Sequence, residues 1–304
     1  MATMLSSDRT TSWIRKAPTA LLLHSHGLLA LGAAAQRWWI GELGLTTDPG
    51  GVVMAALLTI AGYGYLRLVR ASETDIIPSE HIHWVQRFRW VVIIAVLLSS
   101  AVAAWLALGR TLVFGPWSLL ALLPVGVYLL PMLDKNGKAI GLREIPGAKA
   151  FVVALGWTFV TVGFGNTDSD PEPNKVIWLM VMQFCFFLAM AIAFDIGDLK
   201  YDRPGLRTIP QLLGKRWAKA IALVLLVPWL WYYFIFVLVS YSLIFPDPNW
   251  SGVDLMFLLP LLGIVLTALV IAFTDPDRPK WYFAILLDGM VLMIPMLGWL
   301  GGLL

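Results

Sequence analysis

Residues 175–194 read KVIWLMVMQFCFFLAMAIAF, and residues 195–214 directly after them read DIGDLKYDRPGLRTIPQLLG. The first stretch is a continuous apolar run with the length that an α-helix needs to cross a bilayer, about 20 residues. The second stretch turns abruptly to aspartate, lysine and arginine, which favour the membrane surface. The two stretches together predict a transmembrane helix that ends in a charged segment.

The composition of the whole chain agrees with this prediction. Hydrophobic residues make up 59% of the 304 residues, charged residues make up 13%, and the mean hydropathy is +0.77. A chain this apolar cannot cover its surface in water. In lipid the backbone must form helices or a closed barrel, and the apolar runs lack the alternation of barrel strands. We therefore predict an all-α membrane protein that forms one domain over residues 1–304.

The apolar runs predict about nine transmembrane helices, each close to the length that a bilayer requires. They lie at residues 18–39, 50–69, 90–109, 111–133, 148–165, 175–194, 217–244, 252–273 and 281–302.

The basic residues predict the orientation of these helices. Of the 22 lysines and arginines, only Arg37, Arg110 and Lys175 lie on the side opposite to the N-terminus. By the positive-inside rule the N-terminus is cytoplasmic, and nine spans place the C-terminus outside. The chain is thus expected to be a multi-pass protein of the cell (inner) membrane. Basic residues spread between apolar runs favour membrane lipids as partners and argue against nucleic acid.

Three carboxylates follow the apolar run at 175–194. Asp195, Asp198 and Asp202 are spaced so that a continuing helix would place all three on one face. Like charges on one face repel each other, and hard carboxylate oxygens suit magnesium, which phosphate oxygens help to hold. We therefore identify them as candidate Mg²⁺ ligands. A solvated, salt-bridged helix end is an equally good interpretation of the spacing alone.

Basic side chains come directly after or among these carboxylates. Lys200, Arg203 and Arg207 could neutralise a diphosphate, because ammonium and guanidinium groups bind phosphate oxygens.

This segment resembles the second aspartate-rich motif of the UbiA superfamily of membrane prenyltransferases. That motif reads approximately Asp-x-x-Asp-x-x-x-Asp, followed by Gly-x-x-Thr-x-Pro-x-x-x-Gly. Here the tail consists of Gly205, Thr208, Pro210 and Gly214. Residues 142–151, LREIPGAKAF, also look like the loop before the fifth helix of that superfamily.

The resemblance implies a bundle of nine helices around a central cavity that opens to the cytoplasm. It also implies Mg²⁺-dependent transfer of a prenyl group from an isoprenoid diphosphate to a lipophilic or aromatic acceptor. By the same resemblance, Lys149 or Arg143 would face the diphosphate.

One departure from the family pattern leaves catalysis open. Active members carry a first motif, Asn-Asp-x-x-Asp-x-x-x-Asp, at the end of the second helix, where residues 60–70 here read IAGYGYLRLVR. Arg67 and Arg70 could replace one magnesium ion as a phosphate clamp. The alternative is a non-catalytic UbiA-like subunit or lipid-binding scaffold of a larger membrane complex. A secondary transporter is a third interpretation, but no matched pair of broken helices supports it.

Polar residues inside the spans are further candidates. Asp288 lies within the ninth span, where an ionisable group costs about 2.5–3.5 kcal/mol and therefore faces the bundle interior or a cavity. Asp288 therefore has two interpretations, a functional role in the cavity and a structural hydrogen bond. For Gln36 and Gln183 we predict hydrogen bonds between helices.

The first predicted span also carries two histidines. His24 and His26 point to nearly opposite sides of a helix, so packing is favoured over ligation of haem or pigment. Tryptophans such as Trp39, Trp157 and Trp217 lie near predicted span ends and are interpreted as anchors at the headgroup region.

Overall fold

The structure is a computed structural model, and it describes residues 27–43, 48–72, 80–108, 132–133, 139–140, 145–163, 173–200, 207–240, 255–279 and 281–303. The helices are α2 (Gly27–Glu42), α3 (Pro49–Ser72), α4 (Glu80–Arg87), α5 (Arg89–Leu108), α8 (Ala148–Thr158), α9 (Pro173–Asp198), α10 (Ile209–Val224), α11 (Val227–Ser240), α12 (Leu255–Ala272) and α13 (Asp288–Leu303). Two π-helices, η2 (Phe159–Gly163) and η3 (Tyr282–Leu287), adjoin α8 and α13. The short strands β1 (Met132–Leu133) and β2 (Ala139–Ile140) pair antiparallel.

Six helical segments of the described part are long and apolar enough to cross a membrane. They are Pro49–Val69, Arg89–Leu108, Asn174–Asp198, Ile209–Ile235, Leu255–Ala272 and Tyr282–Leu303, and Ala148–Gly163 is a shorter apolar helix. Each of these segments overlaps a predicted span. The protein is therefore a helical, multi-pass membrane protein.

Other parts of the prediction stay untested or need correction. Much of the predicted spans 18–39 and 111–133 lies outside the described residues, so the count of nine and the orientation remain predictions. The last two residues of the 111–133 span belong to β1 and not to a helix. The predicted start at residue 217 is too late, because the helix begins at Ile209, with Pro210 in its first turn. His24 and His26 lie outside the described residues.

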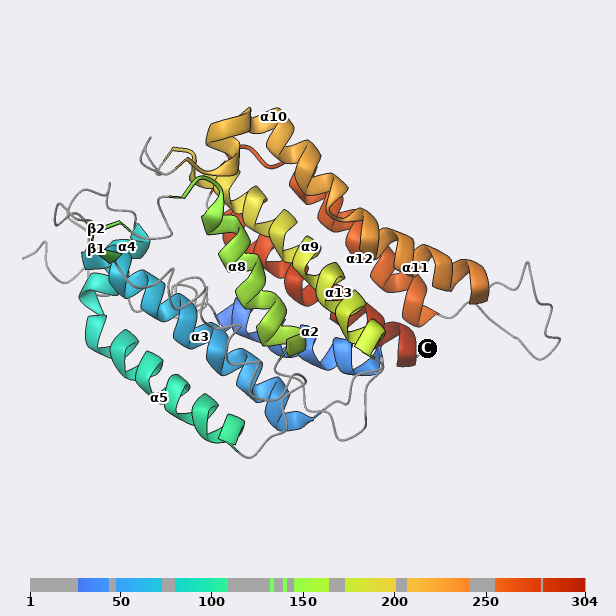
Figure 1. The fold of residues 1–304 in the computed structure, drawn as a ribbon, viewed down its shortest axis with the longest axis horizontal. Coiled ribbons are helices and arrows are strands. Elements are labelled where there is room, and N and C mark those ends of the chain that lie inside the picture. Colours follow the sequence, from blue (N-terminus) through green and yellow to red (C-terminus); the bar gives the residue numbers. More distant parts are fainter. Residues whose placement is uncertain are drawn as a thin grey trace, which may run out of the picture.

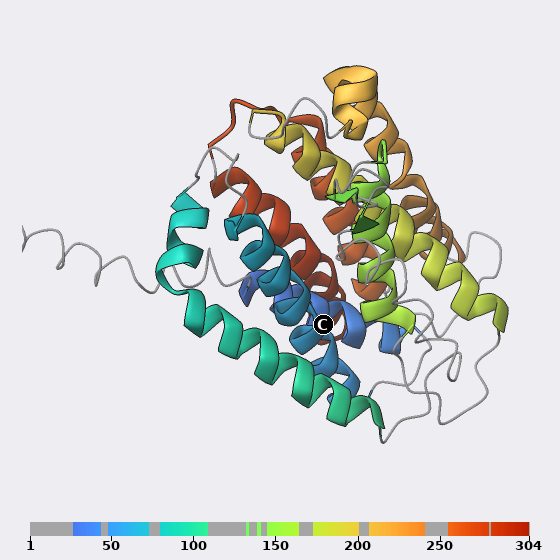
Figure 2. The ribbon, with the colours of Figure 1, turned by 60° about the vertical axis from the view of Figure 1, so that its left-hand side comes forward.

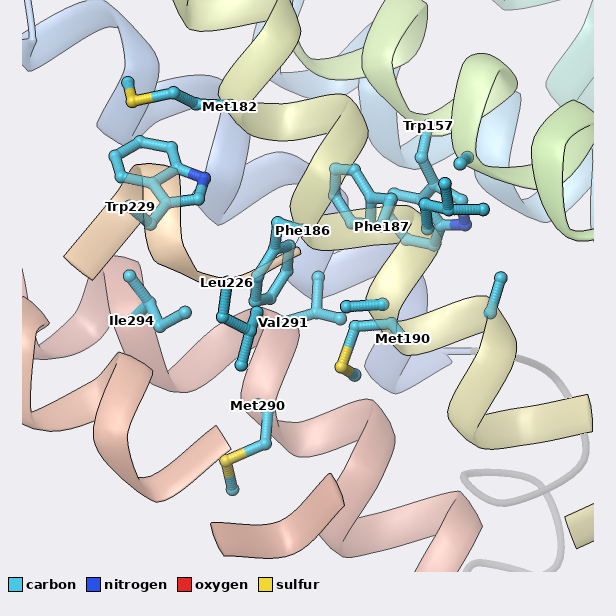
Figure 3. Packing of buried hydrophobic residues seen from close by; sticks show 14 of the residues in the cluster. Trp157, Met182, Phe186, Phe187, Met190, Leu226, Trp229, Met290, Val291 and Ile294 are labelled. Carbon is cyan, nitrogen blue, oxygen red and sulfur yellow. The ribbon is translucent and has the colours of Figure 1, made fainter. Parts of the chain in front are cut away.

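Helix α9 lies in the interior of the bundle and α5 lies at its edge (Figures 1 and 2). In the most apolar window of each helix, 67% of the α9 residues are buried but only 11% of the α5 residues. In α9, Phe186 and Phe187 meet Trp157 of α8 and Val291 of α13 in one apolar cluster (Figure 3). Helix α9 therefore positions any polar side chain that it carries against several other helices.

Polar side chains in the interior bond between helices. The Gln36 side chain of α2 donates to the Val291 carbonyl of α13 at 2.8 Å. The Gln183 side chain of α9 donates to the Gln36 side-chain oxygen at 2.9 Å. Unsatisfied amides in a bilayer interior would be costly. The predicted hydrogen bonds between helices are thus confirmed for both glutamines.

The anchor interpretation is wrong for two of the tryptophans. Trp39 is buried and donates its indole N–H to the Tyr233 hydroxyl at 2.8 Å. Trp157 is also buried, and its indole N–H donates to the Tyr63 hydroxyl at 2.9 Å. Their ring nitrogens found partners inside the bundle instead of at the headgroups. Trp217, in contrast, is 70% exposed.

The packing of Trp39 gives a test of the fold. A Cβ atom added at Gly298 of α13 would lie 2.3 Å from the Trp39 ring, whereas one added at Gly302 would meet no atom within 4 Å. Because Trp39 is buried and hydrogen-bonded, we expect Gly298→Ala to cost about 1–3 kcal/mol by overpacking. Gly302→Ala, in the same helix, should not destabilise the protein. Thermal unfolding in detergent measures both, and equal melting temperatures would contradict this packing.

Candidate functional site at the end of helix α9

Two loops that the sequence singles out meet at one end of the bundle. The backbone N–H of Gly147, just before α8, donates to the carbonyl of Arg207, just before α10, at 3.0 Å. Gly147 has a φ of 74°, which glycine adopts without strain. Arg207 also has a positive φ, of 46°. This contact joins the start of α8 to the start of α10. The start of α8 also lies beside the end of α9, as Figure 1 shows.

Lys149, in the first turn of α8, contacts two carboxylates of α9. Its Nζ atom lies 2.7 Å from an oxygen of Asp195 and 3.4 Å from an oxygen of Asp198. The Asp195 side chain is only 3% exposed, while the side chains of Lys149 and Asp198 are 23% and 38% exposed. A buried carboxylate needs a nearby opposite charge. Lys149 supplies that charge to Asp195 and reaches Asp198 as well.

Two of the three predicted carboxylates lie where their spacing in the sequence indicated. Helix α9 continues to Asp198, so Asp195 and Asp198 share one face, as predicted. Asp202 lies outside the described residues. Within the described ranges no group of three or more His, Cys, Asp or Glu side chains could hold a metal ion. Two carboxylates still fit one magnesium ion, because phosphate oxygens and water commonly complete its coordination.

The predicted phosphate-binding residues lie in different surroundings. Lys149 belongs to the cluster with Asp195, and Arg207 is exposed beside the start of α8. Lys200 forms an exposed ion pair with Asp277, in the loop between α12 and η3. Arg143 and Arg203 lie outside the described residues.

Arg67, Tyr63 and Asp288 form a second polar group within the bundle. Arg67 and Tyr63 are one helical turn apart on α3, and Asp288 begins α13. Tyr63 is close enough to interact electrostatically with Asp288, Arg67 and Lys149. Arg67 likewise acts on the Asp288 carboxylate. The charges of Asp288, Arg67 and Lys149 therefore all act on the Tyr63 hydroxyl.

Comparison with known proteins supports the fold. No family model and no curated protein matches the sequence. Among solved structures, the chain is similar to the apo structure of a UbiA homolog from Aeropyrum pernix K1. The two share 16% sequence identity and a TM-score of 0.54, and the match covers 92% of this chain and 98% of the other. The chain has a UbiA-like fold. The resemblance seen in residues 142–151 and 195–214 is thus confirmed at the level of the fold.

The sequence analysis did not predict two features of the site. Lys149 was identified as a phosphate ligand, but its contacts with Asp195 and Asp198 bridge elements that are far apart in the chain. Tyr63 carries no motif, and only its position one turn before Arg67, inside an apolar helix, could have drawn attention to it.

The Lys149 cluster can be tested by stability measurements. Lys149→Met leaves the buried Asp195 carboxylate without this ammonium, so we expect a loss of about 3 kcal/mol. Lys215→Met is the matched control, because Lys215 pairs with the loop residue Asp275 at 2.6 Å with both side chains at least partly exposed. Such exposed pairs contribute at most about 1 kcal/mol.

A double variant separates the charge effect from lost packing. Adding Asp195→Asn to Lys149→Met removes the uncompensated carboxylate, so the melting temperature in detergent should recover in large part. A double variant that is as unstable as Lys149→Met alone would show that the ion pair is not the cause.

Proposed function

We propose that this protein binds an isoprenoid diphosphate at the cytoplasmic end of its bundle and transfers the prenyl group to a lipophilic or aromatic acceptor. The observation that carries the proposal is the Lys149 ammonium held between two carboxylates at the end of α9. Carboxylates for a metal and a cation for phosphate thus lie side by side, on a UbiA-like fold. The proposed location is the inner cell membrane.

The residues have separate roles in this proposal. Asp195 and Asp198, with Asp202, would hold magnesium, which would neutralise charge on the leaving diphosphate. Lys149 and Arg207 would bind phosphate oxygens directly. In this reaction the bond between the prenyl C1 and the phosphate oxygen would break and the diphosphate would leave. The acceptor would attack the allylic cation with an electron pair and lose its proton to the solvent or to the released diphosphate.

In this proposal, Lys149 makes contacts both in the site without ligand and in the site with bound diphosphate. Its ammonium has three donors on a flexible stem. The contact with buried Asp195 is the shorter, at 2.7 Å, and the contact with half-exposed Asp198 is the longer, at 3.4 Å. In the proposal, Lys149 keeps Asp195 and exchanges Asp198 for a phosphate oxygen, which frees the Asp198 carboxylate for the metal.

One observation favours a second candidate, a non-catalytic subunit or lipid-binding scaffold of a membrane complex. Helix α3 carries Tyr63 and Arg67, and no carboxylate, where the resemblance leads one to expect the first aspartate-rich motif. With one carboxylate cluster the leaving group would be less well stabilised. Under this candidate the chain binds the isoprenoid diphosphate but does not turn it over.

Binding of farnesyl diphosphate to the purified chain tests the proposal. We expect binding that requires Mg²⁺ and that weakens about tenfold in Asp198→Asn, since a charged ligand contact of this kind is worth roughly 1.5–3 kcal/mol. Asp277→Asn is the control, because Asp277 is exposed in the nearby loop between α12 and η3. Binding that is unaffected by Mg²⁺ and by Asp198→Asn would contradict the proposal.

Release of inorganic pyrophosphate separates the two candidates. Turnover with a membrane lipid extract as the source of acceptor supports prenyl transfer. Mg²⁺-dependent binding without any release of pyrophosphate supports the non-catalytic candidate.

A further inference from the structure

A charged pocket lies on the surface of the bundle between α10 and the loop that follows α12. Its volume is about 360 Å³. Lys219 of α10 and Arg278 of the loop line it, together with Phe273, Asp275 and Asp277. Helices α10 and α12 lie side by side here (Figure 1). The pocket thus joins two elements that are far apart in the sequence.

Both carboxylates of the pocket have lysine partners. The Lys215 Nζ atom of α10 lies 2.6 Å from an oxygen of Asp275, and Lys200, just after α9, pairs with Asp277. These pairs hold the loop against α10 and against the end of α9. The pocket therefore lies at the same end of the bundle as the Lys149 cluster, and its carboxylate charges are compensated.

The two cations that line the pocket are bound differently. In the described part of the chain, neither Lys219 nor Arg278 forms an ion pair. The Lys219 ammonium donates to the carbonyl of Ala272 at 2.9 Å, and Arg278 Nε donates to the carbonyl of Phe273 at 3.0 Å. Each side chain is thus held by one backbone carbonyl and keeps further N–H donors. The pocket has two positive charges beyond those of its ion pairs.

Exposed tryptophans place the pocket at the depth of the lipid head groups. Trp217, two residues before Lys219 in α10, is 70% exposed. Trp281, directly before η3, is 54% exposed. Exposed indole rings at the ends of membrane helices favour the head-group region.

An apolar groove begins where the charged pocket ends. Phe273 also lines a second hollow, of about 350 Å³, between α12 and the segment formed by η3 and α13. Its other described lining residues are hydrophobic as well, including Leu266 and Leu269 of α12 and Met293 of α13. From Phe273 to Leu266 the groove follows about two helical turns. It therefore extends from the head-group region towards the apolar interior of the bilayer.

Tyr282 connects the groove with the charged pocket. Its hydroxyl donates to the carbonyl of Val270 in α12, so both walls of the groove are held together. The Arg278 guanidinium carbon lies 5.5 Å from the centre of the Tyr282 ring, which itself lines the groove. The guanidinium thus lies next to the mouth of the groove.

This arrangement selects the kind of ligand. Ammonium and guanidinium groups bind phosphate oxygens, and basic pockets between membrane helices bind anionic lipid head groups. A soluble anion would fill the charged pocket alone and leave the groove empty. A phospholipid with a net negative charge has a phosphate joined to an acyl chain, which matches the charged pocket and the groove that share Phe273.

We propose that Lys219 and Arg278 bind the head-group phosphate of an anionic phospholipid, whose acyl chain lies in the groove between α12 and the η3–α13 segment. The bound phosphate joins α10 to the loop after α12. Neither residue belongs to the Lys149 cluster, so the inference does not depend on the proposed function.

A matched pair of lipids tests this inference. Dioleoyl phosphatidylglycerol and dioleoyl phosphatidylcholine have the same acyl chains, and only the first carries a net negative charge. Titration of the delipidated full chain in detergent, followed by native mass spectrometry, gives an apparent Kd for each lipid. We expect phosphatidylglycerol to bind about 25-fold more tightly, because each of two cations contributes a factor of about five. Equal affinities would overturn the inference without any variant.

Variants then assign the preference to this pocket. Lys219→Met and Arg278→Gln should each reduce the ratio of the two Kd values about fivefold, and the double variant should bring it close to one. Arg89→Gln is the control, because Arg89 is exposed at the start of α5, at the edge of the bundle. A wild-type ratio in both folded single variants, or an equal reduction in Arg89→Gln, would overturn the assignment.

A soluble phosphate distinguishes the lipid from a free anion. An excess of glycerol 3-phosphate should leave phosphatidylglycerol bound, because it has no chain to occupy the groove. Displacement of the lipid by glycerol 3-phosphate would show that the pocket binds a soluble anion, which would overturn the proposed lipid site.

Discussion

The site at the end of α9 depends on the compensation of one buried negative charge. Asp195 is almost inaccessible to solvent, and the Lys149 ammonium lies 2.7 Å from its carboxylate. A buried ion of this kind is stable only with its counter-ion in place. The pair therefore ties α8 to α9, and the Gly147–Arg207 hydrogen bond holds the loop before α10 against the same corner. Asp198 and Arg207 lie at the same corner.

The interior polar groups of the bundle fall into two kinds. One kind is satisfied between helices, as in the contacts of Gln36 with Gln183 and Val291, and of Trp39 with Tyr233. These contacts stabilise the packing between helices. The other kind consists of charged groups, such as Lys149, Asp195 and Asp198 at the end of α9. Charged groups attract polar ligands, which is why we place the proposed ligand site there.

The sequence predicts features that depend on neighbouring residues better than contacts between residues that lie far apart in the chain. The apolar runs predicted the membrane helices because lipid requires about 20 apolar residues for each span. The aspartate spacing predicted a shared face because helical periodicity is local. The Lys149–Asp195 pair joins two helices and had no local signal. The early start of α10 was missed because its first turn precedes the non-helical residue Gly214 and carries no long apolar run.

The tight contact between Gly197 and Phe283 has a mechanical consequence. With no space for even a methyl group between them, η3 cannot slide along α9 without driving its ring into the α9 backbone. The loop before η3 is linked to the rest of the protein by the Lys200–Asp277 and Lys215–Asp275 pairs. Because η3 runs directly into α13, this contact keeps the start of α13 packed against the last turn of α9.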